Sequence, residues 1–432
     1  MYVAIIGRDA GTGFIAKKLL ESSRIKIVYH INPNIYAEAN DRYIPISIPD
    51  PEISVQKSKE FILNFLHDTD LDLIIPIDLQ YQLWDEFYNV AKKRNIPILM
   101  SKDVGILEWS KIIGKKALQD AGIPTPRGKQ YTADEILKDF FNIRRPFVLK
   151  VDQDIREKNI GKQFLKGIGK KSLTTVVTDK NYQEEFFRIK KEINELVLFN
   201  KDQNILIEEY IEGAREISYH ALMNKFGCTY IGSARDYKKR YENDQGRNDI
   251  PMGSYSPVSE FDPAIHLYAE RLHAFLKKKG INYVGFLYLG ILIDKNGVPV
   301  VLEINTRPGE PEIQTILSVI DNDIVNLFYA TATNQPLEKI LFNKKSAVSV
   351  RIVNKEVDNG NKNKSKKTDV FQFPAMSTSD IKINLSQYQE GIHSVLTTSA
   401  DSINDASDKI YKYIESIDIK NYTYRSDIGY FK

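Results

Sequence analysis

The stretch "VVLEINTRPGEPEIQTIL", Val300 to Leu317, joins a short apolar run to a dense set of polar side chains. Val300, Val301 and Leu302 could form a buried strand, but three carboxylates, an amide and an arginine follow directly. Such groups are costly to bury unless they are paired or bind a ligand. The polar residues are Glu303, Asn305, Arg307, Glu310 and Glu312. The stretch therefore predicts a buried strand that ends at a polar site.

Glu303 and Asn305 are two residues apart, so on a strand their side chains share one face. A carboxylate and an amide oxygen are hard oxygen ligands of the kind that Mg²⁺ takes alongside nucleotide phosphates. Arg307 continues that face and could clamp a substrate carboxylate as a fork. A structural salt-bridge cluster is the alternative interpretation of the same residues.

Length and charge restrict the class of protein. At 432 residues the chain predicts two to four domains, and 42% apolar with 27% charged residues is typical of a globular protein. The formal net charge of +3 is too balanced to favour nucleic acid or a membrane surface as the main partner. Any charged ligand must therefore be bound locally.

The single cysteine, Cys228, excludes an internal disulfide and a cysteine-based metal cage. No run approaches the ~18 apolar residues of a membrane span, and the start "MYVAIIGRDAG" lacks the basic and apolar regions of a signal peptide. We expect a cytoplasmic protein that is not bound to a membrane.

The N-terminal part alternates strand and helix patterns. Strands are predicted at 2–7, 24–33, 71–78 and 96–100, and helices between them at 14–23, 58–68 and 83–95. This alternation predicts an open parallel sheet, in which ligands sit beyond the carboxyl ends of the strands.

The turn "GRDAGTG" does not predict a nicotinamide site. Gly7, Gly11 and Gly13 do not have the spacing of a dinucleotide fingerprint, and "YHINPN" offers no acid to bind a ribose. A tight strand-to-helix turn explains the glycines, although such a turn can still hold a phosphate.

From about Ser101 the patterns become mostly antiparallel. A helix at 108–121 precedes the strand "PFVLKVD", which carries Lys150, and "YVGFLYLGILIDKNGVPVVLEIN" predicts a hairpin that turns at 294–297. The loop "GKQFLKGIGKK" (161–171) can fold over a polyphosphate, because glycine lets amides approach while lysine neutralises charge. A basic surface hairpin, with Lys150 as a snorkelling edge residue, is the alternative.

Two further segments are candidate binding loops. "LIEEYIEGAREIS" places Glu208, Glu209 and Glu216 around one connection, where acceptors could bind an adenine amino group and ribose hydroxyls. Solvated acids that flank a turn are the alternative interpretation. The segment 233–257 has too little apolar content for a core element and is interpreted as a substrate loop. A long exposed polar loop is the alternative. The polar candidates in this segment are Asp236, Lys238, Arg240 and Asn248.

The last segment begins near Pro336. It contains the basic run "NGNKNKSKK" (359–367), interpreted as a solvated loop, and an amphipathic helix pattern at 405–417. No Ser/His/Asp or Cys/His nucleophile pattern stands out, and the six histidines have no ligand spacing.

Together these motifs resemble the ATP-grasp superfamily, and within it the phosphoribosylamine–glycine ligase family. "VLEINTRPGEPEIQTIL" is similar to that family's E-F-N-x-R-F-G-D-P-E-x-Q-x-x-L. The stretch 234–257 is similar to its Q-D-H-K-R…D-x-G-x-N-x-G-G-M-G-[AS]-Y-S-P, and "YVGFLYLGILID" and "YRSDIGYF" also match. The resemblance runs nearly from end to end.

The resemblance implies an α/β fold that is α+β in its ATP-grasp part. It implies an N-terminal parallel-sheet domain over 1–100, an ATP-grasp domain over 101–335 with a small lid at about 124–208, and a C-terminal α+β domain over 336–432. It also implies an ADP-forming ligase that joins an amino-acid carboxylate to an amine through an acyl phosphate, acting as a monomer or homodimer.

Residue roles follow from the same resemblance. Glu303 and Asn305 would bind Mg²⁺ or Mn²⁺, and the catalytic set that holds the amino acid would be Arg307, Asp236 and Lys238. The residues implied for ATP are Lys111, Lys150, Lys166, Gly167, Gly169, Glu208, Tyr210, Ile211 and Glu216.

The amine side departs from the family. The family's G-G-R-E-H and P-G-N-x-G appear here as "GRDAGTG" and "NPNIYAE", its G-P-E-x-P-L appears as "PIDLQYQ", and the phosphate loop is longer. Three hypotheses stay open: the family's own substrates, a different amino acid and amine pair, or a non-catalytic ATP-binding descendant.

Overall fold

The structure is a computed structural model, and it is described here for most of the chain. The described residues are 1–33, 40–48, 55–77, 85–102, 104–152, 174–197, 204–212, 215–248, 250–259, 263–354, 380–388, 391–417, 419 and 422–430. The loop 161–171, the basic run 359–367 and most of "NPNIYAE" lie outside them.

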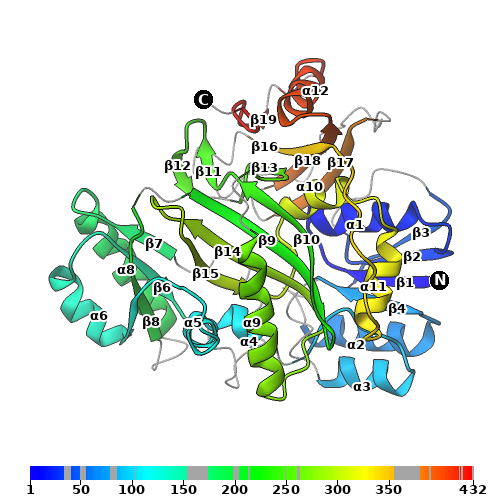
Figure 1. Ribbon diagram of the computed structural model, residues 1–432, viewed down its shortest axis with the longest axis horizontal. Helices are drawn as coiled ribbons and strands as arrows, with labels where there is room; N and C mark the ends of the chain where they lie inside the picture. Colours follow the sequence, from blue (N-terminus) through cyan, green and yellow to red (C-terminus); the bar gives the residue numbers. More distant parts are fainter. Residues whose placement is uncertain are drawn as a thin grey trace.

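A parallel four-stranded sheet forms the N-terminal part, as predicted (Figure 1). Its order is β3-β2-β1-β4, and β1 pairs in parallel with β2 and β4. The bounds are β1 Tyr2–Ile6, β2 Ile27–Ile31, β3 Tyr43–Ile46 and β4 Leu73–Pro76. The predicted strand at 96–100 is wrong, because this segment makes only an isolated bridge, Ile74 to Ile98.

Helices cover both faces of this sheet. Val3 and Ile5 of β1 pack into a core with α1, whereas Ala4 and Ile6 pack into a second core with α2 and α3. The alternation follows from the two-residue period of a strand. The helices are α1 Ala10–Leu20, α2 Val55–Asp68 and α3 Asp85–Lys93.

A long, largely antiparallel sheet runs through the middle of the molecule and into its C-terminal part (Figure 1). Its order is β15-β14-β9-β10-β13-β16-β18-β17, with β19 on β16. The predicted hairpin is confirmed as β14 and β15, turning at Gly297, whose φ of +81° suits glycine. The bounds are β9 Arg215–Asn224, β10 Gly227–Asp236, β13 Gly253–Ser256, β14 Gly285–Ile293, β15 Pro299–Asn305, β16 Ser346–Asn354, β17 Lys382–Tyr388, β18 Gly391–Ala400 and β19 Tyr422–Thr423.

The long sheet also buries both faces. On one side Leu272 of α9 and Ile410 of α12 belong to its largest core. On the other side Ile316 of α10 and Phe328 of α11 share a core with Ile5 of β1, so these helices lie between the two sheets. The bounds are α9 Ala264–Lys278, α10 Glu312–Ser318, α11 Ile324–Ala332 and α12 Ile403–Glu415.

A smaller antiparallel sheet, ordered β5-β8-β6-β7, has a separate core and stands at the left of Figure 1. Tyr210 to Glu212 connect its strand β8 to β9 of the long sheet. The elements are β5 Gly128–Thr132, β6 Phe147–Val151, β7 Thr174–Val177, β8 Asn204–Glu209, α6 Ala133–Asp139, η2 Phe140–Asn142 and α8 Tyr182–Val197.

The prediction of a single helix at 108–121 is wrong, because the chain leaves the helical conformation at Ser110. The segment forms two helices, α4 Ile106–Trp109 and α5 Lys111–Asp120, separated by Ser110. Ser110 is extended, and its side chain accepts a hydrogen bond from the amide of Ile113, so it ends one helix and caps the next.

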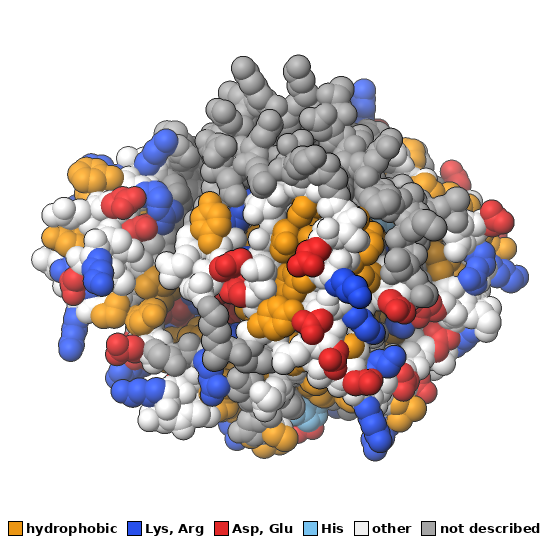
Figure 2. Space-filling view, turned by 90° about the horizontal axis from the view of Figure 1, so that it is seen from above, with side chains coloured by type: hydrophobic (Ala, Val, Ile, Leu, Met, Phe, Trp, Pro, Cys, Tyr) orange, Lys and Arg blue, Asp and Glu red, His pale blue; other side chains and the backbone are white. Residues whose placement is uncertain are grey.

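The mixed α/β class is confirmed, and the domain boundaries stay a prediction. None of the described helices is long and apolar enough to cross a membrane. On the face seen in Figure 2, the coloured acidic and basic side chains are interspersed.

Candidate functional site

Glu303 near the end of β15 is the centre of the candidate site. Nζ of Lys111, from the first turn of α5, lies 2.8 Å from Oε2 of Glu303. The side-chain nitrogen Nδ2 of Asn305 donates a hydrogen bond to Oε1 of the same carboxylate over 3.3 Å. The predicted pair thus shares one face of β15, and a lysine faces it from another element.

The charge of Glu303 is stabilised by three lysines. Burial raises the pKa of this carboxyl, but Lys111, Lys150 and Lys238 together hold it well below its usual range. For Lys111, burial lowers the pKa, and the attraction of Glu303 and Glu108 raises it above the usual value. Both groups are therefore charged at neutral pH.

A buried triad lies beside Glu303. Glu208 is only 2% exposed and forms two ion pairs. Its Oε1 lies 2.6 Å from Nζ of Lys115, and its Oε2 lies 2.6 Å from Nζ of Lys150. Lys150 also donates to the carbonyl oxygen of Leu302, at 3.4 Å. These contacts connect α5 and the small sheet to β15. Glu208 is the anionic partner of the buried Lys150.

A second group of charges comes from the segment after β10. Nζ of Lys238 pairs with Glu216 of β9 and lies 3.9 Å from Oδ2 of Asp236. Burial lowers the pKa of Lys238, but Asp236, Glu216 and Glu303 raise it well above its usual value. Of the four polar candidates in the predicted substrate loop, Asp236 and Lys238 thus reach the same site as Glu303. Arg240 and Asn248 lie further along the chain, in β11 (Lys239–Tyr241) and β12 (Gln245–Asn248).

Arg307 lies just beyond β15 and is oriented by Glu108 of α4. Its Nε donates to Oε1 of Glu108 at 3.0 Å, while the amide of Thr306 donates to Oε2 at 2.8 Å. The nearby charges of Glu108 and, more weakly, Asp9 raise the pKa of Arg307 further. Asp9 belongs to the turn "GRDAGTG", so the N-terminal part approaches the site here.

Aromatic rings and a buried acid line the same region. The rings of His220 and Tyr288 stack with centroids 4.6 Å apart, and burial lowers the pKa of His220 to about 3. Burial, with Asp236 nearby, raises the pKa of Glu312 to about 8. Oε2 of Glu312 is buried and accepts no hydrogen bond from the part of the chain that the structure describes.

Helix α5 is held at its N-terminus by two oxygens. Ser110 caps Ile113, and Oδ1 of Asp152, at the end of β6, accepts from the amide of Ile112 over 3.2 Å. Oγ of Ser110 donates to Oδ2 of the same carboxylate over 3.2 Å. These bonds fix the turn that presents Lys111, and an acid there suits the helix dipole.

The structure brings together Lys111, Lys150, Glu208, Glu216, Asp236, Lys238, Glu303, Asn305 and Arg307. Tyr210, which is exposed, and Ile211 lie in the connection between the small sheet and the long sheet. Lys166, Gly167 and Gly169 are outside the described residues. All of these roles stay predictions.

The sequence did not single out Glu108, Lys115 and Asp152. A helical repeat was an available signal for Lys115, which is four residues after Lys111 and therefore on the same face of α5. Glu108 and Asp152 act through contacts with residues 199 and 40 positions away, which no local pattern reveals.

Known proteins are similar to this chain over nearly its full length. Residues 109–313 match the family model "Phosphoribosylglycinamide synthetase, ATP-grasp (A) domain". The phosphoribosylamine–glycine ligase of Leptospira interrogans is 26% identical, over 98% of this chain and 96% of its own. That of Caldanaerobacter subterraneus is 28% identical, over 99% of each chain.

Solved structures show the same fold. The phosphoribosylamine–glycine ligase of Thermotoga maritima matches with a TM-score of 0.71 and 20% identity, over 99% of this chain and 100% of its own. The biotin carboxylase domain of the Hydrogenobacter thermophilus 2-oxoglutarate carboxylase, solved with MgADP, matches with a TM-score of 0.69 and 17% identity, over 98% and 91%.

Residues 109–313 thus match an ATP-grasp domain, and the solved structures share the fold of the whole chain. The chain resembles the phosphoribosylamine–glycine ligases over nearly its full length.

Proposed function

We propose that this chain is an ATP-dependent, ADP-forming ligase that joins a carboxylate to an amine through a C–N amide bond. The names of its full-length relatives and the ATP-grasp match support an enzyme of this class. The observation that carries the proposal is the ionised Glu303, held beside Asn305 among lysines from three different segments of the chain.

The residues present fit a magnesium ion shared with a nucleotide. No group of three His, Cys, Asp or Glu side chains in the described residues could hold a metal alone. Mg²⁺ is usually bound by one or two protein ligands with phosphate oxygens and water, and Glu303 with Asn305 supply this donor set. Their oxygens would also accept Mn²⁺.

Lysines around the metal ligands would hold the phosphates. The charges of Lys111 and Lys150 both lower the pKa of Glu303, and Lys115 and Lys150 both pair with Glu208. The three amines therefore lie near one another, beside Glu303 and Glu208. The backbone at Tyr210 and Ile211 would receive the adenine. Bound ATP supplies the phosphoryl group that converts a carboxylate into an acyl phosphate, which an amine can then attack.

The carboxylate substrate would lie between Arg307 and the Asp236–Lys238 pair. Glu108 holds Nε of Arg307, which fixes the plane of the guanidinium before substrate arrives. Such preorganised charges stabilise developing charge without reorganising during the reaction. Asp236 would bind the amino group of an amino acid, and Lys238 would offset charge on the carboxylate.

The N-terminal turn before α1, where the amine substrate would bind, bears on the identity of that amine. Oδ1 of Asp9 accepts from the amide and the hydroxyl of Thr12, at 2.6 and 2.7 Å. This carboxylate occupies the N-terminus of α1, where a phosphate would otherwise be favoured. We infer that the amine need not carry a phosphate at this position, so a pair other than phosphoribosylamine and glycine is a real candidate.

The test is ADP release from the full chain with Mg-ATP, using glycine and other amino acids paired with phosphoribosylamine or simpler amines. We expect release that needs both a carboxylate and an amine. Calorimetry that shows tight Mg-ATP binding without ADP release for any pair would instead favour a non-catalytic ATP-binding protein. We further propose a cytoplasmic location and a monomer or homodimer.

A further inference from the structure

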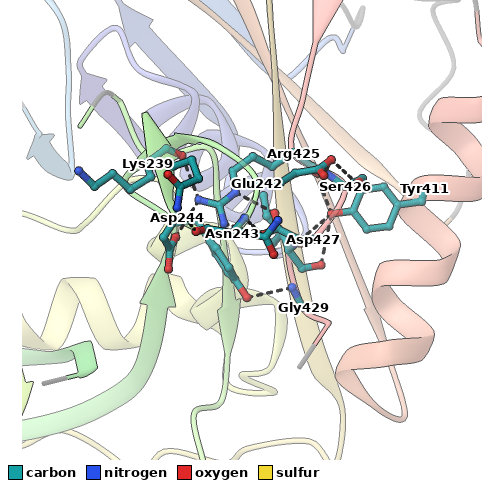
Figure 3. A network of polar contacts seen from close by, with 12 residues as sticks. Lys239, Glu242, Asn243, Asp244, Tyr411, Arg425, Ser426, Asp427 and Gly429 are labelled. Atoms are coloured by element: carbon teal, nitrogen blue, oxygen red, sulfur yellow. Dashed lines mark hydrogen bonds and ion pairs between the residues drawn. The ribbon is translucent and has the colours of Figure 1, made fainter. Parts of the chain in front are cut away.

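The C-terminal segment from Tyr422 to Tyr430 lies against the hairpin that follows β10 (Figure 3). This hairpin consists of β11 Lys239–Tyr241 and β12 Gln245–Asn248, and it begins one residue after Lys238. The two segments are about 180 positions apart in the chain, so their contact is a feature of the tertiary fold.

Arg425 makes the central contacts. Its side chain is 1% exposed, and Nη1 donates to the carbonyl oxygen of Lys239 over 3.0 Å and to Oδ1 of Asp244 over 2.9 Å. The guanidinium carbon also lies 4.8 Å from the centre of the Tyr237 ring. Arg425 therefore contacts the residues on both sides of Lys238.

The remaining nitrogens of Arg425 are held by its own segment. Nε and Nη2 donate to the two oxygens of Asp427, at 2.8 and 2.7 Å, which is a bidentate pair. Oδ2 of Asp427 also accepts from the amide of Asn243, at 2.9 Å. The fork thus has a fixed orientation when it meets the hairpin, a geometry that lysine cannot reproduce.

Further bonds anchor this segment to α12 and to Tyr237. The hydroxyl of Tyr411 donates to the carbonyl oxygen of Arg425 at 2.9 Å, and the amide of Ile428 donates back to that hydroxyl at 3.0 Å. The amide of Gly429 donates to the hydroxyl of Tyr237 at 3.2 Å. The anchored segment holds the chain at Tyr237 and Lys239 from one side.

We propose that Arg425 is a positioning residue for the carboxylate site, because it sets the path of the chain at Lys238 and so aims that amine at Glu216 and Asp236. This inference deepens the proposed function and rests on it. Arg425 makes no contact with Lys111, Lys150 or Glu303. Its link to the residues implied for ATP runs through Lys238 to Glu216, so the affinity for Mg-ATP should depend on it less than the use of the carboxylate does.

The test is Arg425→Met in the full chain. We expect the KM for the carboxylate substrate to rise, or kcat to fall, by about tenfold or more, while the Kd for Mg-ATP changes less than threefold. Arg425→Lys keeps the charge but not the fork, so it should recover only part of the loss. Equal losses in Mg-ATP affinity and carboxylate use, or unchanged kinetics in the folded variant, would overturn the proposal.

Arg94→Met is the matched control. Arg94 also donates to backbone oxygens, those of Leu66, His67 and Thr69 at 3.0, 2.6 and 2.8 Å, but it does so in the N-terminal part. It should lower stability without the selective effect on the carboxylate. If both Arg425 variants fail to fold while Arg94→Met folds, Arg425 serves the whole fold and the positioning role is wrong.

A readout without turnover separates this proposal from the proposed function. The rate at which acetic anhydride modifies Lys238, followed by mass spectrometry, should rise in Arg425→Met, while buried Lys115 stays protected. If the wild-type chain releases no ADP with any pair, the proposed function fails, and the labelling still decides the role of Arg425. Unchanged labelling of Lys238 would overturn it.

Discussion

Glu303 carries a negative charge that three lysines stabilise and that a metal would share in the working site. Replacing it with glutamine keeps the shape and removes the charge. We expect Glu303→Gln to lower ADP release at least a hundredfold, because the metal loses its anionic ligand and Lys111 its ion pair. Glu303→Ala should be nearly inactive as well. Steady-state ADP release at several Mg²⁺ concentrations measures the loss.

Asp294→Asn is a control within the same hairpin. Asp294 lies at the exposed turn between β14 and β15 and accepts from the amides of Asn296 and Val298. Its substitution should leave turnover close to that of the wild-type chain. Unchanged turnover in Glu303→Gln would contradict the metal assignment.

Glu312 predicts a pH dependence of stability. Burial raises its pKa to about 8, so between about pH 5 and pH 8 the folded chain holds a proton that the unfolded chain has released. Its contribution to the free energy of unfolding therefore falls as pH rises, by at most about 1.4 kcal/mol per pH unit. Glu312→Gln mimics the protonated acid and should flatten this slope. Denaturant unfolding at several pH values would show it, and an unchanged slope would refute it.

At the scale of residues, the sequence predicted which polar side chains lie at the end of β15 better than it predicted the residues that contact them. Glu303, Asn305 and Arg307 stood out because polar groups after an apolar run are costly without partners. Glu108 and Lys115 did not stand out, since a buried acid on a four-residue helix and one lysine among three in α5 look like ordinary surface charges. Their roles depend on contacts between distant segments.

Helix α5 is the element whose placement matters most for nucleotide binding, because it carries Lys111 and Lys115. Its cap, Ser110, can be removed by Ser110→Ala, which should cost about 1 kcal/mol of stability. Because the cap also fixes the turn that presents Lys111, we expect Mg-ATP to bind about fivefold more weakly. Calorimetry with Mg-ATP measures the change.

Thr132→Ala is the matched control for the cap of α5. Thr132 caps α6 in the small sheet through a capping box with Glu135. Its loss should lower stability to a similar extent and leave the affinity for Mg-ATP unchanged. Equal weakening in both variants would mean that the cap acts on stability alone.

Elements with a clear period were predictable, and short or interrupted ones were not. The alternating N-terminal pattern and the turn at 294–297 were both recovered, because period and turn residues are local signals. The strand β3 was missed, since "YIPI" is four residues long and contains proline. The division of 108–121 into α4 and α5 depends on the contact of Ser110 with Asp152, which the sequence does not display.

At the scale of the whole molecule, a buried ion pair joins the segment between β15 and α10 to the C-terminal part of the long sheet. Nη2 of Arg351, whose side chain is 0% exposed, lies 2.5 Å from Oε2 of Glu310. Arg351→Met would leave Glu310 buried without its cation, and we expect it to cost roughly 3–5 kcal/mol of unfolding free energy. Adding Glu310→Gln should recover part of the loss. A double variant as unstable as the single one would contradict this account.

The long sheet and α1 have a consequence for synthesis on the ribosome. The apolar face of α1, with Phe14 and Leu19, is covered by Ile316 and Phe328, and Lys17 of α1 donates to the carbonyl oxygen of Ile383. These covering residues are translated roughly 300 positions later, or about 15–60 s at ordinary elongation rates. During that interval the nascent chain presents an uncovered apolar helix face to solvent, so its yield should depend on chaperones that shield emerging polypeptides.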